Sequence, residues 1–176
     1  MNSKILKLEI LGIVFIVILG SFLHFTFELS GKNIFVGTFS AVNESTWEHL
    51  KLAFFPALLW LLIELKFLKE KPKNFFLAKT KGVYLMLFLI VAIFYFYKAI
   101  LGKDYLIFDI LTFVIAVILG QLTSYKLMFW QNISLKHNKI ALGFLIILLL
   151  SFVVFTFYPP KIFIFQDPIS KNFGIF

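Results

Sequence analysis

Cysteine and arginine are both absent from this chain of 176 residues. Without cysteine there are no disulfides, thiolate metal ligands or thiol nucleophiles, so a reactive site must use histidine, carboxylates, hydroxyls and amides. Charge is also scarce, because 15% of the residues are charged whereas 61% are hydrophobic and 25 are phenylalanine. A globule this small cannot shield that much apolar surface from water. The composition therefore indicates an integral membrane protein.

Five apolar segments approach the roughly 20 residues that cross a bilayer as a helix. They are residues 10–28, 50–66, 82–101, 105–125 and 140–158. No Ala-x-Ala-like cleavage site follows the first segment, so we interpret it as a retained span and not as a signal peptide. The sequence predicts an all-α, polytopic membrane helix bundle of about five transmembrane helices, forming a single membrane domain over residues 1–176.

The lysines predict the orientation of these spans, because short cytoplasmic loops carry an excess of basic residues. With the amino terminus inside, eleven lysines lie toward the inside: Lys4, Lys7, Lys66, Lys69, Lys71, Lys73, Lys79, Lys81, Lys126, Lys136 and Lys139. Six lie toward the outside: Lys32, Lys51, Lys98, Lys103, Lys161 and Lys171. We therefore predict an inner amino terminus and an outer carboxyl terminus. An outer loop then covers residues 29–49, and an outer tail, residues 159–176, folds back over the outer face.

The net charge of +8 is explained by this orientation. We accordingly expect membrane lipids as partners and no nucleic acid. The sequence does not indicate an oligomeric state. Lysine, isoleucine, phenylalanine and asparagine are plentiful, as in proteins of AT-rich genomes. This composition suggests a multi-pass protein of a bacterial inner or plasma membrane.

A polar run, residues 43–49, stands at the start of the second predicted span. Ser45 and Glu48 have the spacing of a capping box, which would start the helix without further function. Capping does not require Glu44 or His49. Ionisable side chains at the end of a membrane helix raise the free energy of the folded protein unless they pair with other polar groups or bind a ligand.

The first span offers a second pair at the same level, because His24 and Glu28 are four residues apart on one helix face. Imidazoles and carboxylates suit zinc or another first-row divalent metal. We predict His24, Glu28 and His49 as metal ligands and Glu44 or Glu48 as the catalytic general base. The alternative is a structural network of hydrogen bonds and ion pairs, which is favoured because the sequence has no complete metalloenzyme pattern.

Other polar residues are expected inside the bundle. The predicted polar core contains Asn43, Ser45, Asp109 and Gln121. We expect Asp109 to pair with Lys98 or Lys103, or to stay protonated. Glu64 is expected to pair with one of three lysines: Lys66, Lys69 or Lys81. Trp47 and Lys51 are expected in the headgroup region, the first as a belt residue and the second by snorkelling.

Several of these residues carry a resemblance to a known family. They are Leu23-His24-Phe25 with Glu28, Ser30-Gly31, the run Val42 to Lys51, Phe55-Pro56, Glu64, Asp109, Gly120-Gln121, and Pro159-Pro160 to Asp167-Pro168 and Gly174. The chain resembles a family of small prokaryotic integral membrane proteins of unknown function that bears an Asn-Glu-Ser-x-Trp-Glu-His motif. The resemblance implies a five-span or similar membrane protein and carries no activity with it.

Three functions stay open at this point. The first is a metal-assisted enzyme that acts on lipid-like substrates at the outer leaflet, with the histidine and glutamate cluster as its site. The second is a small transporter or ion-conducting protein that uses Asp109 and Gln121 as part of a polar path. The third is a non-enzymatic membrane scaffold.

Overall fold

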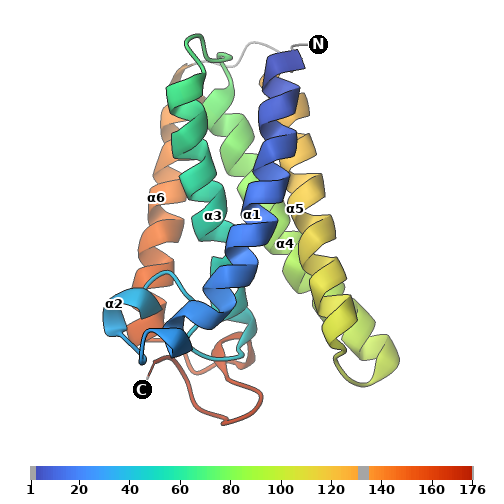
Figure 1. Ribbon diagram of the computed structural model, residues 1–176, viewed down its shortest axis with the longest axis vertical. Coiled ribbons are helices and arrows are strands. Elements are labelled where there is room, and N and C mark those ends of the chain that lie inside the picture. The colour runs from blue at the N-terminus through green and yellow to red at the C-terminus, as the bar shows by residue number, and fades with distance from the viewer. Residues whose placement is uncertain (1–2, 131–134, 176) are drawn as a thin grey trace.

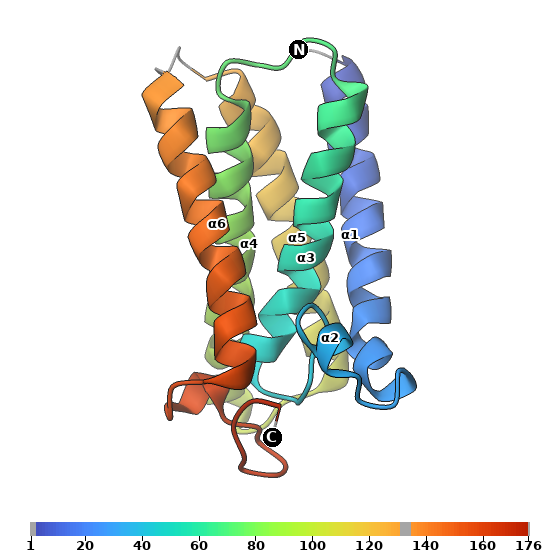
Figure 2. The same ribbon diagram turned by 90° about the vertical axis from the view of Figure 1, so that its left-hand side faces the viewer.

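The computed structural model describes residues 3–130 and 135–175, and within these ranges the chain is all-helical. Five long helices run side by side (Figures 1 and 2). They are α1 (Ser3–Leu29), α3 (Thr46–Phe67), α4 (Phe75–Leu101), α5 (Leu106–Met128) and α6 (Leu135–Phe157). A short helix, α2 (Ile34–Gly37), lies in the first long loop, and a 3₁₀ turn, η1 (Phe163–Phe165), lies in the tail.

Four of the long helices are long and apolar enough to cross a membrane: α1, α4, α5 and residues 136–157 of α6. The fifth long helix, α3, has 22 residues but is not among these four. It carries four charged side chains: Glu48, Lys51, Glu64 and Lys66. The first three are buried in the bundle. An all-α fold with four apolar helices suited to a membrane is therefore confirmed.

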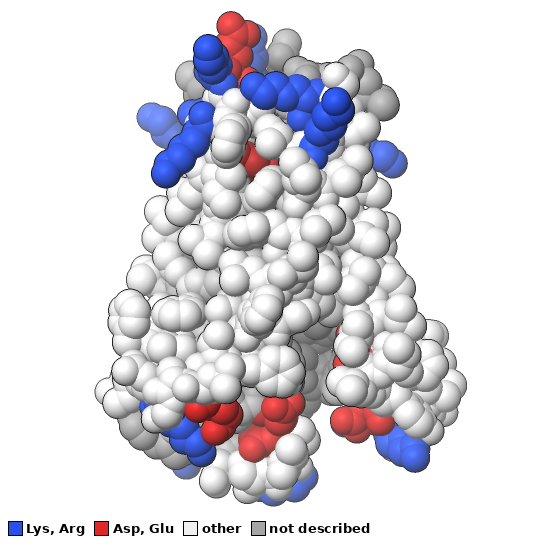
Figure 3. All heavy atoms as spheres, in the orientation of Figure 1, with Lys and Arg blue, Asp and Glu red and all other residues white. Residues whose placement is uncertain are grey.

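The two termini lie at opposite ends of the bundle (Figure 1). We call the end near Ser3 the amino end and the end near α2 and the tail the carboxyl end. In Figure 3 lysines gather at the amino end, and a broad belt of uncharged atoms separates them from the charges at the carboxyl end. Large apolar side chains are exposed along α1 within this belt, including Leu11, Ile18 and Phe22. Exposed apolar faces of this extent suit contact with lipid chains.

Helices α4 and α5 form an antiparallel hairpin, as the tight turn between them predicts. Gly102 closes the turn at φ 75°, a left-handed conformation that favours glycine. Gly82 and Gly120 let the two backbones approach closely, because a Cβ at either glycine would lie 2.7 Å from the carbonyl oxygen of the other. Towards the carboxyl end the hairpin diverges from the other helices (Figure 1), and Figure 3 shows a hollow beside it.

The tail covers the carboxyl end, as expected for it. The Asn43 side-chain amide donates to the Gly174 carbonyl at 2.9 Å, and the Ile175 N–H donates to the Thr156 carbonyl at 3.1 Å. Phe165 packs on Trp47 with ring centroids 4.7 Å apart. Trp47 also packs on Phe152 and Phe155 of α6. Trp47, expected as a belt residue in the headgroup region, is thus half-buried and packs on protein aromatic rings at this end of the bundle.

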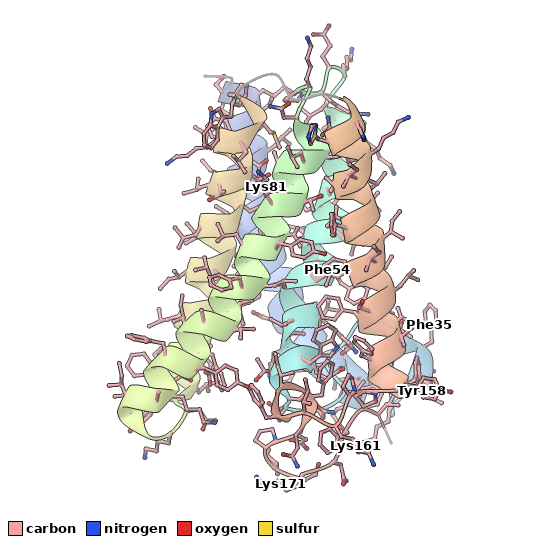
Figure 4. The ribbon with its side chains drawn as sticks, turned by 180° about the vertical axis from the view of Figure 1, so that it is seen from behind. Phe35, Phe54, Lys81, Tyr158, Lys161 and Lys171 are labelled. Atoms are coloured by element: carbon pink, nitrogen blue, oxygen red, sulfur yellow. The ribbon has the colours of Figure 1, made fainter. Side chains whose placement is uncertain are left out.

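Aromatic side chains also fill the interior between α3 and α6. Phe54 and Phe152 are fully buried, with ring centroids 4.9 Å apart. Figure 4 shows Phe54 midway along the bundle, between Lys81 at the amino end and Tyr158 at the carboxyl end. This packing holds α3 in the interior with its polar side chains enclosed.

The glycine contact between α4 and α5 predicts a difference between two matched variants. In Gly120→Ala the new methyl group would meet the Met86 side chain at 2.2 Å, so we expect a stability loss of about 1–3 kcal/mol. In Gly143→Ala, on α6, the methyl group meets nothing within 4 Å, so we expect no loss. Thermal unfolding in detergent measures both. Equal melting temperatures for the two variants would contradict the close approach of α4 and α5.

Candidate functional site

Two histidines and one glutamate come together at the carboxyl end. His24 lies near the end of α1, Glu44 lies in the loop before α3, and His49 lies in the first turn of α3. His49 Nε2 is 3.4 Å from Glu44 Oε2, and His24 Nε2 is 4.0 Å from Glu44 Oε1. One ligand atom from each residue lies within 4.8 Å of the others. We call these three residues the His–Glu–His cluster.

The local sequence explains how Glu44 reaches this position. The Asn43 side-chain oxygen accepts a hydrogen bond from the Ser45 N–H at 2.9 Å, which folds the chain into a tight turn. The Ser45 hydroxyl then accepts from the Glu48 N–H at 3.4 Å and caps α3. The predicted capping by Ser45 is confirmed, but Glu48 does not complete the capping box, because its side chain accepts from the Val42 N–H and the Ser45 N–H donates to Asn43. The turn and the cap together place Glu44 beside the first turn of α3, where His49 lies.

A backbone contact sets the role of each nitrogen in His49. His49 Nδ1 lies 3.0 Å from the Ser45 carbonyl oxygen, an acceptor, so Nδ1 carries the hydrogen and donates it. In the neutral ring Nε2 then keeps its lone pair, and Nε2 is the nitrogen that faces Glu44. A histidine that donates one N–H to a backbone carbonyl and offers the other nitrogen is the usual arrangement of a metal ligand.

His24 is held mainly by packing. Its ring lies 5.2 Å from the His49 ring and 4.8 Å from the Phe25 ring, measured between centroids. Its Nδ1 is buried and has no hydrogen-bond partner among the described residues. A buried polar atom without a partner is uncommon in a native structure, and functional sites are one place where it occurs.

The cluster is only half enclosed. The side chains of His24 and His49 are 30% and 32% exposed, and that of Glu44 is 46% exposed. When the His49 ring is protonated, its Nε2–H donates to Glu44, and this hydrogen bond lowers the pKa of Glu44 below its ordinary value. Glu44 is therefore a carboxylate at neutral pH, the form that binds a cation.

The structure does not bring Glu28 or Glu48 into this cluster. Glu28 is 67% exposed and pairs with Lys32 at 3.6 Å. Glu48 is buried, lies 2.6 Å from Lys51 Nζ and accepts a hydrogen bond from the Val42 N–H at 3.1 Å. Their predicted roles as metal ligand and general base stay predictions.

Lys51 does not reach the membrane surface. Its side chain is fully buried, and its Nζ also donates to the Gly37 carbonyl at 2.9 Å and the Ser40 carbonyl at 3.4 Å. The expectation that Lys51 snorkels is therefore wrong. The Lys51–Glu48 pair instead ties the loop that contains α2 to the start of α3.

The other predicted polar residues lie apart from the cluster. Asp109, near the start of α5, accepts a hydrogen bond from the Tyr97 hydroxyl. Of the two alternatives expected for Asp109, the pairing with lysine is therefore wrong, and the protonated carboxyl stays a prediction. Lys98 pairs with Asp104 at 3.2 Å instead. Gln121 is buried nearer the amino end, where its amide nitrogen lies beside Gly12 of α1.

Sequence reasoning missed a second polar centre near the amino end. Lys79 Nζ lies 2.6 Å from Glu9 Oε1 and 2.5 Å from Glu64 Oε2. The Trp60 indole N–H donates to Glu64 Oε1 at 3.1 Å. The expected partners of Glu64 were wrong because Lys79 lies closer to the bundle interior than Lys66, Lys69 or Lys81. The available signal was Glu9, an acidic residue at the start of the long apolar stretch of α1.

The fold and these two centres define a membrane-type helical bundle with buried ionisable groups. The chain belongs to a family of unknown function (DUF6512), whose family model matches residues 1–175. No curated protein and no solved structure matches it.

The Lys51–Glu48 pair predicts the stability of three variants. In Glu48→Gln or Lys51→Met one buried charge loses its partner, so we expect each variant to lose about 3–5 kcal/mol. The double variant removes both charges and should recover part of that loss. Chemical unfolding in detergent measures the three. Additive losses in the double variant would show that the two side chains do not act as a pair.

Proposed function

We propose that the protein is a five-span membrane protein that binds a divalent metal ion through His24, Glu44 and His49. The observation that carries the proposal is the His–Glu–His cluster, with ligand atoms from three residues within 4.8 Å of one another. Two neutral imidazoles and one carboxylate match the ligands that zinc and its first-row neighbours prefer. Three protein ligands leave a fourth position open, which is typical of catalytic rather than structural zinc sites.

The burial of α3 supports its inclusion as the fifth span. Its charged side chains Glu48, Lys51 and Glu64 are enclosed by protein and paired, so they meet no lipid. Charges inside a bundle that pair with one another are tolerated in a membrane. Five spans also agree with the termini at opposite ends of the bundle (Figure 1).

The position of the cluster favours a lipid-like substrate. It lies at the end of apolar helices, where a bilayer has its headgroups, and its side chains are partly exposed. A metal ion there would supply a nucleophilic water near neutral pH and polarise an ester or phosphoryl group. The proposed activity is thus metal-assisted hydrolysis of a lipid head group, at the outer face of a bacterial inner or plasma membrane.

Metal binding predicts a shift in thermal stability. We expect added zinc to raise the melting temperature of the chelator-treated protein, since a ligand at 100 times its Kd adds about 2.7 kcal/mol. His49→Ala should lose most of this shift because it removes one of three ligands. His137→Ala, at the opposite end of the bundle, is the matched control and should keep it. The measurement is thermal unfolding with and without zinc, together with the metal content of the purified protein.

Two outcomes would contradict parts of this proposal. If zinc does not raise the melting temperature of the parent protein, or raises it equally in the two histidine variants, the metal site is wrong. If zinc binds as expected but no head group or fatty acid is released from phospholipid vesicles, metal binding stands and lipid hydrolysis is wrong.

Orientation is tested by single cysteines, because the chain has no cysteine of its own. Lys161, in the exposed tail (Figure 4), and Lys71, exposed between α3 and α4, lie at opposite ends of the bundle. With the carboxyl end outside, Lys161→Cys should react with an impermeant maleimide in intact cells, and Lys71→Cys should react only after lysis. Labelling in the reverse pattern would place the His–Glu–His cluster on the inner side.

A further inference from the structure

The second polar centre, near the amino end, contains more negative than positive charge. Glu9 of α1, Glu64 of α3 and Lys79 of α4 are all buried, with side-chain exposures of 0%, 1% and 4%. One ammonium group faces two carboxylates, so the centre has one excess negative charge when both acids are ionised. An uncompensated charge in a protein interior is too costly to persist, and such a group takes up a proton instead.

The hydrogen bonds indicate which acid takes the proton. Glu64 Oε1 accepts a hydrogen bond from the Trp60 indole, and Glu64 Oε2 lies 2.5 Å from Lys79 Nζ, an ion-pair contact without hydrogen-bond geometry. A donor at one oxygen and a positive charge at the other both favour the ionised form of Glu64. In Glu9 only Oε1 faces Lys79, at 2.6 Å, and Oε2 is buried with no hydrogen-bond partner among the described residues. A proton on Glu9 Oε2 therefore disturbs no existing contact.

Lys79 is the one positively charged group among the described residues that acts on Glu9. A bound proton can supply the second positive charge that the centre needs to be neutral. Glu9 faces Glu64 of α3 and Lys79 of α4, the two ionisable groups that act on its charge. On α5, Ser124 and Tyr125 lie one turn from Gln121, which contacts α1 at Gly12. Glu9 lies about one turn from Gly12 toward the same end. Ser124 and Tyr125 have buried hydroxyls without partners, and they bring no positive charge.

We propose that this centre is a proton-binding site, in which Glu9 holds one exchangeable proton on Oε2 beside the Lys79–Glu64 ion pair. The proposal is independent of the metal site at the carboxyl end. Proton uptake adds a hydrogen to Glu9 Oε2 and brings the centre from one net negative charge to neutral, with no other bond changed.

Infrared spectroscopy of the purified protein in detergent tests this site directly. A protonated carboxyl group gives a carbonyl stretching band that a carboxylate lacks. We expect this band in the parent protein at neutral pH and its loss at alkaline pH. Glu9→Gln should abolish the band, whereas Glu28→Gln, on the exposed end of the same helix, should keep it.

Two further variants keep the test decisive if Glu9→Gln does not fold. Lys79→Met removes the only positive charge in the centre, so we expect both glutamates to be protonated and the band to approach twice its intensity. Asp104→Asn should leave the band unchanged, because Asp104 is exposed at the other end of the bundle and pairs with Lys98. A band that is absent from the parent at every pH, or that disappears in Asp104→Asn, would overturn the proposal.

A sodium ion is the competing occupant of a site with excess negative charge. We expect the band to be the same in sodium chloride and in choline chloride. Loss of the band on addition of sodium would show that the centre exchanges its proton for a metal cation, and would overturn its assignment as a proton site.

Discussion

Pairing of buried charges on α3 is the constraint on which the rest of the structure depends. The helix carries Glu48 and Lys51 near one end and Glu64 near the other, and all three are buried. Each would be too costly in lipid, so α3 must lie inside the bundle and other segments must bring partners to it. Lys79 of α4 serves this purpose at the amino end. At the carboxyl end, Lys51 satisfies Glu48 and also binds the carbonyls of the loop.

The positions of the long helices could be predicted from hydropathy, because a stretch of roughly 20 apolar residues has few other stable forms. The predicted span 82–101 lies within α4, and the tight turn at Gly102 makes α4 and α5 neighbours. The start of α3 could also be predicted, since a cap is a local feature of Ser45 and Glu48. The helices extend further than expected at the amino end because lysines continue a helix beyond the apolar part of a span.

Contacts between helices could not be read from spacing along one helix. His24 and Glu28 are on adjacent turns of one face, but Glu28 lies beyond the enclosed part of α1 and faces Lys32. Glu44 is the acid that does contact both histidines, and it lies in a loop. The direction of a loop side chain cannot be predicted from the 3.6-residue period of a helix. The place of Glu44 depends on the Asn43 turn and on the Asn43 contact with Gly174 at the far end of the chain. Lys79 was missed for a similar reason, since only the packing of α4 shows that it faces inward.

The two polar centres are built on the same pair of helices. Helix α1 carries Glu9 and His24, and α3 carries Glu64 and His49. With a rise of 1.5 Å per residue, each helix separates its two residues by roughly 22 Å, which is less than the roughly 30 Å of a hydrocarbon core. Between the centres the contact of α1 with α3 is close, because a Cβ at Gly20 would lie 2.3 Å from the Leu52 carbonyl oxygen. The two centres therefore share one pair of helices, and the backbone contact at Gly20 fixes how that pair packs between them.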